Sequence, residues 1–127
     1  MTFEKARFFI LTEQKITDEK TGDVTYEHAI KEVEGYLFQT QLPESMELVT
    51  IGVYKRAACN KTVKGMAAWV VTDLDTGYQI CEGDTRKKAV ETFLKWYATK
   101  YDRLRRSNDG RDYRKMVEKF DSMIEGC

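Results

Sequence analysis

A six-residue turn pattern occurs twice in this chain and constrains the fold more than any other feature of the sequence. The pattern T-D-x-x-T-G spans residues 17–22 and again residues 72–77. An Asp at the first turn position accepts a hydrogen bond from a backbone N–H two residues on, and the Gly supplies the positive φ that a hairpin loop with a bulge needs. The sequence therefore predicts two β-hairpins and an antiparallel sheet.

The predicted strands lie on either side of these turns and are rich in aromatic and β-branched residues. They cover residues 3–12, 14–17, 23–30, 47–54, 65–72 and 78–82. In the segment 23–30, larger side chains alternate with smaller or polar ones. The larger side chains are Val24, Tyr26, His28 and Ile30, which lie on one face. The alternation predicts that this face is buried or half-buried.

Residues 31–46 fit two structures. Residues 31–38 are compatible with a short helix or with a bent strand that has Gly35 at the kink. Pro43 then indicates a turn at residues 42–45.

Two helices are predicted after the sheet. Asp84 or Thr85 is a suitable N-cap for the first, at about residues 85–104. Its apolar residues recur at helical spacing and predict a stripe that buries four aromatics against the sheet or a partner subunit, with stacking on a ligand as the alternative. The stripe consists of Ala89, Val90, Phe93, Leu94, Trp96, Tyr97, Tyr101 and Leu104. The second helix, at about residues 111–125, has its apolar side at Tyr113, Met116, Val117, Phe120, Met123 and Ile124.

These elements predict a single α+β domain over residues 1–127. Its antiparallel sheet has four to six strands over about residues 3–82, and the two C-terminal helices follow.

Catalytic and metal-binding motifs are missing from the sequence. It contains no P-loop, no G-x-G-x-x-G, no H-E-x-x-H, no G-x-S-x-G and no zinc-type spacing. His28 is the only histidine, and Cys59, Cys81 and Cys127 form no C-x-x-C pair, so Cys81 is expected to be a small buried hydrophobe. We expect a protein that is not an enzyme and uses no cofactor or metal, although the many carboxylates leave an acid–base pair open.

No membrane or export segment is predicted. No apolar run approaches 18 residues, and residues 8–11 are too short for the core of a signal peptide. A cytoplasmic location is expected.

The formal net charge of zero hides a strong asymmetry. Residues 86–115 hold eleven Lys and Arg against four Asp and Glu, and the rest of the chain carries the opposite excess. Such a segment is typical of a surface that meets an anionic ligand, nucleic acid or an acidic partner, and equally of a solvated helix face beside an acidic sheet.

The best candidate site is the segment 105–115, which places five cations around a turn and at the start of a helix. Arg offers bidentate phosphate geometry, and helix N-termini favour anions. The predicted ligand-binding residues here are Arg105, Arg106, Asn108, Arg111, Asp112 and Arg114. The alternative is that Arg105 and Arg106 complement the dipole of the first helix while Asp109 caps the second.

Arg86 belongs to a second basic group, residues 86–88, in the first turn of the long helix, where the dipole disfavours cations. It is therefore included in the predicted site. The two basic groups are about 30 Å apart along a helix of some twenty residues, so a small ligand could meet both only across two subunits.

The order of elements, together with residues 76–91 and the Arg-rich segment after the first helix, resembles the phage Thoeris anti-defence sponge proteins. Those small proteins are not enzymes; they have an extended antiparallel sheet followed by two helices, oligomerise, and sequester cyclic ADP-ribose-type signals or, in some members, cyclic oligonucleotides. The resemblance implies a counter-defence protein of the host cytoplasm that forms a homo-oligomer and binds a phosphorylated ligand of the cyclic nucleotide class.

Two positions depart from that family's pattern. Glu82 stands at the strand end where the family has an aromatic, and Thr92 stands where it has an Asn. The resemblance then implies that another aromatic, such as Trp69 or Tyr78, stacks on the base.

Three functions are compatible with these sequence features. The first is sequestration of a cyclic nucleotide or cyclic ADP-ribose-type signal. The second is an anti-CRISPR-like inhibitor that binds a protein or a nucleic acid through the basic C-terminal helices, and the third is an enzyme acting on a phosphorylated substrate.

Overall fold

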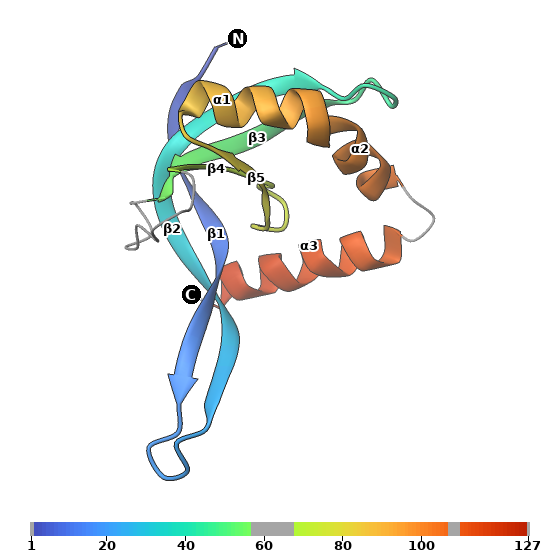
Figure 1. Cartoon of the computed structure of the whole chain (residues 1–127). Coiled ribbons are helices and arrows are strands. Elements are labelled where there is room, and N and C mark those ends of the chain that lie inside the picture. The colour runs from blue at the N-terminus through green and yellow to red at the C-terminus, as the bar shows by residue number, and fades with distance from the viewer. Residues whose placement is uncertain (1, 57–67, 107–109, 127) are drawn as a thin grey trace.

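The computed structural model describes residues 2–56, 68–106 and 110–126, in which a strongly curved antiparallel sheet is followed by helices (Figure 1). The described residues form five strands in the order β1-β2-β3-β4-β5, so each pairs with its neighbour in the sequence. They are β1 (Glu4–Thr17), β2 (Val24–Gln41), β3 (Leu48–Lys55), β4 (Trp69–Thr72) and β5 (Gln79–Gly83). The predicted α+β fold is confirmed. Residues 65–67 of the predicted strand lie outside the described residues.

β1 and β2 form a hairpin that is much longer than the rest of the sheet. They pair from Glu4 opposite Leu37 to Thr17 opposite Val24. On its other side β2 pairs with β3 only over its last part, from Gly35 onward. Of the two alternatives for the segment after residue 30, the strand is therefore right and the short helix is wrong. A Cβ on Gly35 would stand 2.5 Å from the carbonyl oxygen of Val53, so the close strand packing requires glycine here.

The distal part of this hairpin, residues 12–29, projects from the body and is called the arm below (Figure 1). The predicted burial of its apolar face is wrong: Val24 is 45% exposed, Tyr26 is 66% exposed and His28 is also exposed. Ile30, at the base of the arm, is half-buried. The pattern predicts correctly which residues share a face, but the described chain leaves Val24 and Tyr26 exposed there, while the ring of His28 lies 6.2 Å from that of Tyr78.

The two repeated turns have the same backbone. Asp18 and Asp73 each accept the N–H of the residue two positions on, at 2.8 and 3.2 Å. Gly22 and Gly77 have φ values of 74° and 73°, and each donates its N–H to the Asp carbonyl. The predicted turn chemistry is confirmed in both hairpins.

The turn between β2 and β3 has the same pattern of backbone bonds without the sequence motif. Leu42 donates its N–H to the carbonyl of Glu47 and accepts the N–H of Met46, as the Asp does at the matching position of the other turns. Met46 has the positive φ, 61°, that Gly has there. The missing turn carboxylate comes from a helix: Asp102 accepts the N–H groups of Glu44 and Ser45 at 2.8 and 2.9 Å.

The first predicted helix is continuous but contains one wider turn. It consists of α1 (Arg86–Thr92), a π-helical turn η2 (Phe93–Tyr97) and α2 (Ala98–Arg106). Of the two predicted N-caps the structure uses Thr85, whose side chain accepts the N–H of Lys88 at 3.1 Å. In η2 the N–H of Ala98 reaches back five residues to Phe93, which inserts one residue into the helical repeat.

This insertion changes which side of the helix faces the sheet. Phe93 and Tyr101 are buried as predicted, but Trp96 and Tyr97 are 66% and 36% exposed, so the sheet does not bury these two of the four aromatics. Leu94 and Leu104 are exposed as well. Beyond η2, the residues that face the sheet lie one position later in the sequence than α-helical spacing predicts. Ala98 and Asp102 are buried at these shifted positions.

The helix covers one face of the sheet and closes the larger core cluster. Phe38 of β2 meets Phe93 edge-on with ring centroids 6.1 Å apart, and Phe93 meets Tyr101 at 5.8 Å. Val53 and Val71, both fully buried, lie in the same cluster. Burying a large apolar side chain contributes about 1.5–3 kcal/mol, so this cluster is the main source of stability.

The last helix, α3 (Gly110–Glu125), crosses below the sheet and ends near the base of the arm (Figure 1). Tyr113 and Phe120 are buried, and the other apolar residues predicted for this side are half-buried, which confirms the predicted stripe. Phe120 packs on Gly77, whose carbonyl accepts the N–H of Leu11 at 3.0 Å. The second repeated turn is therefore held between β1 and α3.

Asp102 makes stability sensitive to acid. Burial alone would raise its pKa, but the N–H groups of Ser45 and Glu44 and the guanidinium of Arg106 lower the pKa to about 2. Because the folded-state value lies below the ordinary value of about 3.9, the carboxylate stabilises the fold fully above that pH. We expect this contribution to be lost as the pH falls from about 4 to about 2. Urea unfolding midpoints across this range should show it, and Asp102→Asn should flatten that part of the profile, whereas Asp121→Asn should not.

Candidate functional site

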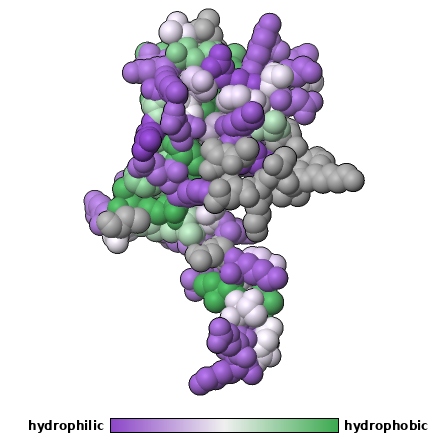
Figure 2. Space-filling view, turned by 90° about the vertical axis from the view of Figure 1, so that its left-hand side faces the viewer, coloured by the Kyte–Doolittle hydropathy of each residue, from purple (hydrophilic) through white to green (hydrophobic). Residues whose placement is uncertain are grey.

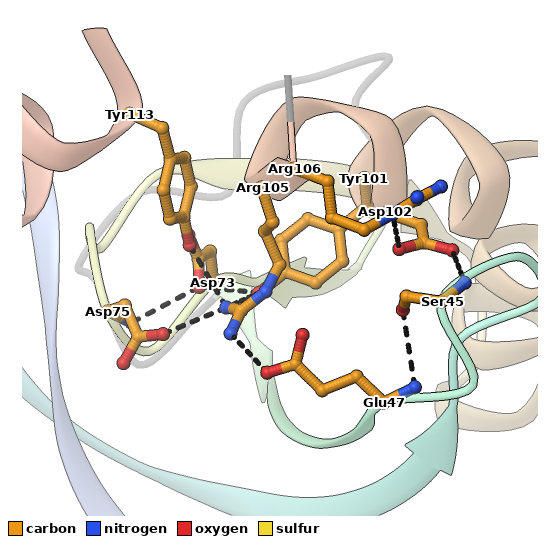
Figure 3. Close-up of polar contacts among 9 residues, drawn as sticks. All are labelled: Ser45, Glu47, Asp73, Asp75, Tyr101, Asp102, Arg105, Arg106 and Tyr113. Carbon is orange, nitrogen blue, oxygen red and sulfur yellow. Dashed lines mark hydrogen bonds and ion pairs between the residues drawn. The ribbon is translucent and has the colours of Figure 1, made fainter. Parts of the chain in front are cut away.

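A buried polar cluster joins the turn between β4 and β5 to both helices, and Asp73 lies at its centre (Figure 3). The two oxygens of its carboxylate, which is 3% exposed, accept the hydroxyl of Tyr101 at 2.8 Å and that of Tyr113 at 2.5 Å. Thr76 of the same turn donates to it at 2.8 Å. One turn carboxylate thus fixes α2 and α3 against the sheet.

Arg105 completes the cluster from α2. Its Nη1 donates to the hydroxyls of Tyr101 and Tyr113 at 3.1 and 3.3 Å. Its side chain, 18% exposed, also pairs with Asp75 at 2.9 Å and with Glu47 at 3.1 Å. Figure 3 shows the guanidinium between the two turns that carry these acids. A half-buried Arg with two carboxylates and two phenols around it acts as a structural tie between loops.

The two tyrosines are hydrogen-bond donors rather than proton acceptors. Burial, and next the negative charge of Asp73, raise the pKa of both Tyr101 and Tyr113 above the usual value of a phenol. Both hydroxyls therefore stay protonated at neutral pH and keep donating to the carboxylate. The cluster gives one wall of the site a fixed geometry.

A cavity of about 170 Å³ lies against this wall. Its lining combines the cluster with apolar side chains of β5, α2 and α3, and five of the lining residues are exposed. The lining residues are Asp73, Thr76, Tyr78, Gln79, Ile80, Tyr97, Lys100, Tyr101, Leu104, Tyr113 and Met116. Pockets for drug-sized ligands have volumes of about 300–1,000 Å³, so this cavity suits one planar ring system and leaves the rest of a larger ligand outside.

The exposed part of the lining supplies the chemistry for such a ring. Tyr78 and Tyr97 are each 36% exposed and offer aromatic surface, on which a heterocycle stacks favourably. Lys100 carries a solvent-exposed ammonium group, 6.0 Å from the ring centroid of Tyr97. The cavity can therefore hold an aromatic ring while Lys100 attracts a negative charge attached to it.

Arg86 and Trp69 belong to a different cluster, at the N-terminal end of α1. The guanidinium of Arg86 lies between the rings of Phe3 and Tyr36, 4.3 and 4.4 Å from their centroids. Trp69 is half-buried and packs on Tyr36 at 6.3 Å. The cation–π contacts explain a basic residue in the first turn of α1, which the helix dipole disfavours.

Within one copy, the described residues of the predicted site lie in two groups at the two ends of the long helix, as its length predicts. Arg105 and Arg106 lie at the other end of the helix from Arg86 and Trp69, and Arg106 pairs with Asp102 at 3.0 Å. Arg114 is exposed on α3. Asn108 lies outside the described residues, as do the side chains of Arg111 and Asp112.

The basic end of the helix has acidic partners that the sequence did not reveal. Arg103 pairs with Glu44 at 2.7 Å, and Arg105 and Arg106 have the partners given above. The opposite charge excesses of residues 86–115 and of the sheet are thus partly neutralised inside the molecule, as in the alternative of a helix beside an acidic sheet. The only sequence feature that pointed to these ion pairs was the opposite charge excess of the two parts of the chain.

Sequence reasoning named one residue of the cavity, Tyr78, and missed the others. Tyr97 was assigned to the core, and Lys100 and Gln79 were not singled out. Cys81 is buried next to α1, and burial raises the pKa of its thiol to about 12, so the predicted small buried hydrophobe is confirmed.

Among the described residues, no three His, Cys, Asp or Glu side chains gather closely enough to hold a metal ion. None of the described helices combines the length and hydrophobicity that crossing a membrane requires. Comparisons of the chain with protein-family models, with curated proteins and with solved structures find no match.

Proposed function

We propose that this protein binds and sequesters a small nucleotide-type signal, of the cyclic nucleotide or cyclic ADP-ribose class, without transforming it. The observation that carries the proposal is the cavity between β5, α2 and α3, with Tyr78 and Tyr97 in its lining and Lys100 beside them. A base or other planar ring enters the cavity, and a phosphate outside it lies near the ammonium group.

The rigidity of the inner wall favours tight binding. Tyr101 and Tyr113 are fixed by Asp73 before any ligand arrives, so binding orders few further side chains. A site that is organised in advance keeps more of its contact energy as affinity. Sequestration needs this property, because a signal is removed from solution only when the protein holds it tightly.

The same wall favours binding over catalysis. Asp73 already accepts three side-chain hydroxyls, and the raised pKa values keep both phenols protonated. These groups hold their positions instead of exchanging protons with a ligand. The lining therefore supports a binding protein better than an enzyme that acts on a phosphorylated substrate.

Thermal denaturation with a panel of cyclic mononucleotides, cyclic dinucleotides and ADP-ribose isomers tests the proposal. A ligand present at 100 times its dissociation constant stabilises the fold by about 2.7 kcal/mol, so at least one member should raise the melting temperature by several degrees. Lys100→Ala and Tyr97→Ala should weaken that binding tenfold or more. Lys115→Ala, which changes an exposed lysine of α3 outside the cavity lining, should leave it unchanged.

Two results would count against sequestration. One is the lack of a shift with every member of the panel. The other is turnover of a ligand, which would make the protein an enzyme. If nucleic acid or a protein binds instead, with an affinity that falls steeply with salt, the function is that of the anti-CRISPR-like inhibitor, for which the exposed lysines of α1 are the candidate surface.

A further inference from the structure

Among the described residues, no third strand extends the distal end of the arm, which is a two-stranded ribbon. Residues Thr12–Thr17 of β1 pair with Val24–Ala29 of β2, and β3 joins β2 only from Gly35. Figure 2 shows the arm standing clear of the body, with hydrophobic side chains exposed among hydrophilic ones. Isolated two-stranded ribbons are marginally stable in water, so the arm gains much from a surface that covers it.

One face of the arm is suited to be covered. Val24 and Tyr26 are 45% and 66% exposed, and alternation places both on this face together with His28. The register sets Lys15 opposite Tyr26 and Glu13 opposite His28, so charged residues flank the apolar ones. Exposed apolar groups with a charged rim are typical of protein–protein contacts.

The arm is also acidic. Residues 12–29 hold five carboxylates against two lysines, and all seven side chains are exposed. This charge argues against nucleic acid as the partner, since phosphates would be repelled. It also argues against two arms packing on each other, because like charges would meet.

A surface with the opposite charge lies on the outer side of α1 and η2. Trp96 is 66% exposed and lies beside a shallow depression of about 240 Å³. The depression is lined by Lys88, Glu91, Thr92, Lys95 and Trp96. Lys95 lies 5.2 Å from the indole centroid, so an aromatic anchor and a positive rim occur together. This group of five residues is called the Trp96 surface below.

We propose that the arm of one copy docks on the Trp96 surface of a second copy, and that the second arm returns to the first copy. Val24 and Tyr26 pack against the indole, while the acidic tip of the arm, with Glu19 and Asp23, lies among Lys88 and Lys95. Both surfaces belong to this chain, and in a two-fold dimer each arm meets the Trp96 surface of the other copy, which closes the assembly. None of the residues named for this contact lines the cavity, so the dimer can be tested independently of the proposed function.

Reversing the charge of each surface tests the dimer by sedimentation velocity. The arm variant is Glu13→Lys/Glu19→Lys/Asp23→Lys, and the Trp96-surface variant is Lys88→Glu/Lys95→Glu. Each alone should dimerise at least tenfold more weakly than the unaltered chain. An equimolar mixture should recover a heterodimer, because each reversed surface then meets an opposite charge. Glutamate at position 88 also suits the first turn of a helix, so folding is preserved.

Further variants keep the test decisive. Lys115→Glu/Glu118→Lys alters exposed charges of α3 away from both surfaces and should dimerise as the unaltered chain does. Tyr26→Ser and Trp96→Ala should each weaken the dimer tenfold or more while circular dichroism stays unchanged. A monomer at all concentrations would overturn the proposal. So would a dimer that Tyr26→Ser abolishes and the Trp96-surface variant leaves intact, which would indicate arm–arm pairing.

Discussion

Replacing Asp73 with Ala is expected to cost roughly 2–6 kcal/mol of unfolding free energy, because each of two buried hydroxyls left without an acceptor costs about 1–3 kcal/mol. The variant leaves the hydroxyls of Tyr101 and Tyr113 buried without their acceptor, and both helices lose their tie to the turn. Urea unfolding followed by circular dichroism measures the loss. Asp73→Asn keeps one acceptor oxygen, so its free energy of unfolding should lie between those of the unaltered chain and of Asp73→Ala.

The chain provides its own control for this substitution. Asp18 occupies the same place in the same turn but is exposed and accepts a single backbone N–H. Asp18→Ala should cost about 1 kcal/mol or less. Equal losses at the two positions would mean that the Asp73 cluster contributes nothing beyond the turn itself.

Gly77→Ala is the second substitution with a large expected effect, and Gly22→Ala is its matched partner. Both glycines have a φ near 73°, where a Cβ costs about 1–2 kcal/mol. At Gly22 the added methyl would meet nothing within 4 Å, whereas at Gly77 it would stand 2.5 Å from a ring carbon of Phe120 and 2.7 Å from the backbone nitrogen of Leu11. The clash should add roughly 1–3 kcal/mol, the usual cost of overpacking.

Calorimetric melting of the two variants separates strain from clash. The difference between their unfolding free energies measures the clash with Phe120 of α3 and with the backbone of Leu11 in β1, because the backbone strain is common to both. Gly77→Ala combined with Phe120→Ala removes the contacting ring, so the added cost of Gly77→Ala should shrink in that background. Identical stabilities for Gly22→Ala and Gly77→Ala would show that α3 does not rest on this turn.

Local sequence signals predicted much of the fold. The repeated turns could be found because the Asp, Thr and Gly that build them lie within six residues. The third turn, at Leu42 to Glu47, could not, because its carboxylate comes from Asp102, which lies 58 residues from Glu44. Met46 at positive φ gives no signal in a sequence pattern, since side chains rarely take that conformation.

The site was less predictable than the fold for a similar reason. Arg105 and Arg106 stood out as cations, but their partners are acids from other turns and, for Arg106, from a helix position that α-helical periodicity places outside the core. The cavity depends on the same periodicity. Regular α-helical spacing assigns Tyr97 to the core, so the sequence did not indicate that Tyr97 lines the cavity.

The π-turn of η2 also determines how the chain tolerates changes in length. Such a turn is an α-helix with one extra residue, so deleting one residue between 93 and 97 restores regular winding and rotates the following segment by about 100°. Tyr97 would then turn toward the sheet, and Asp102 and Arg105 would lose their partners in the loops. Substitutions can change the cavity one side chain at a time, but a single-codon deletion here would remove the cavity wall and release two turns together.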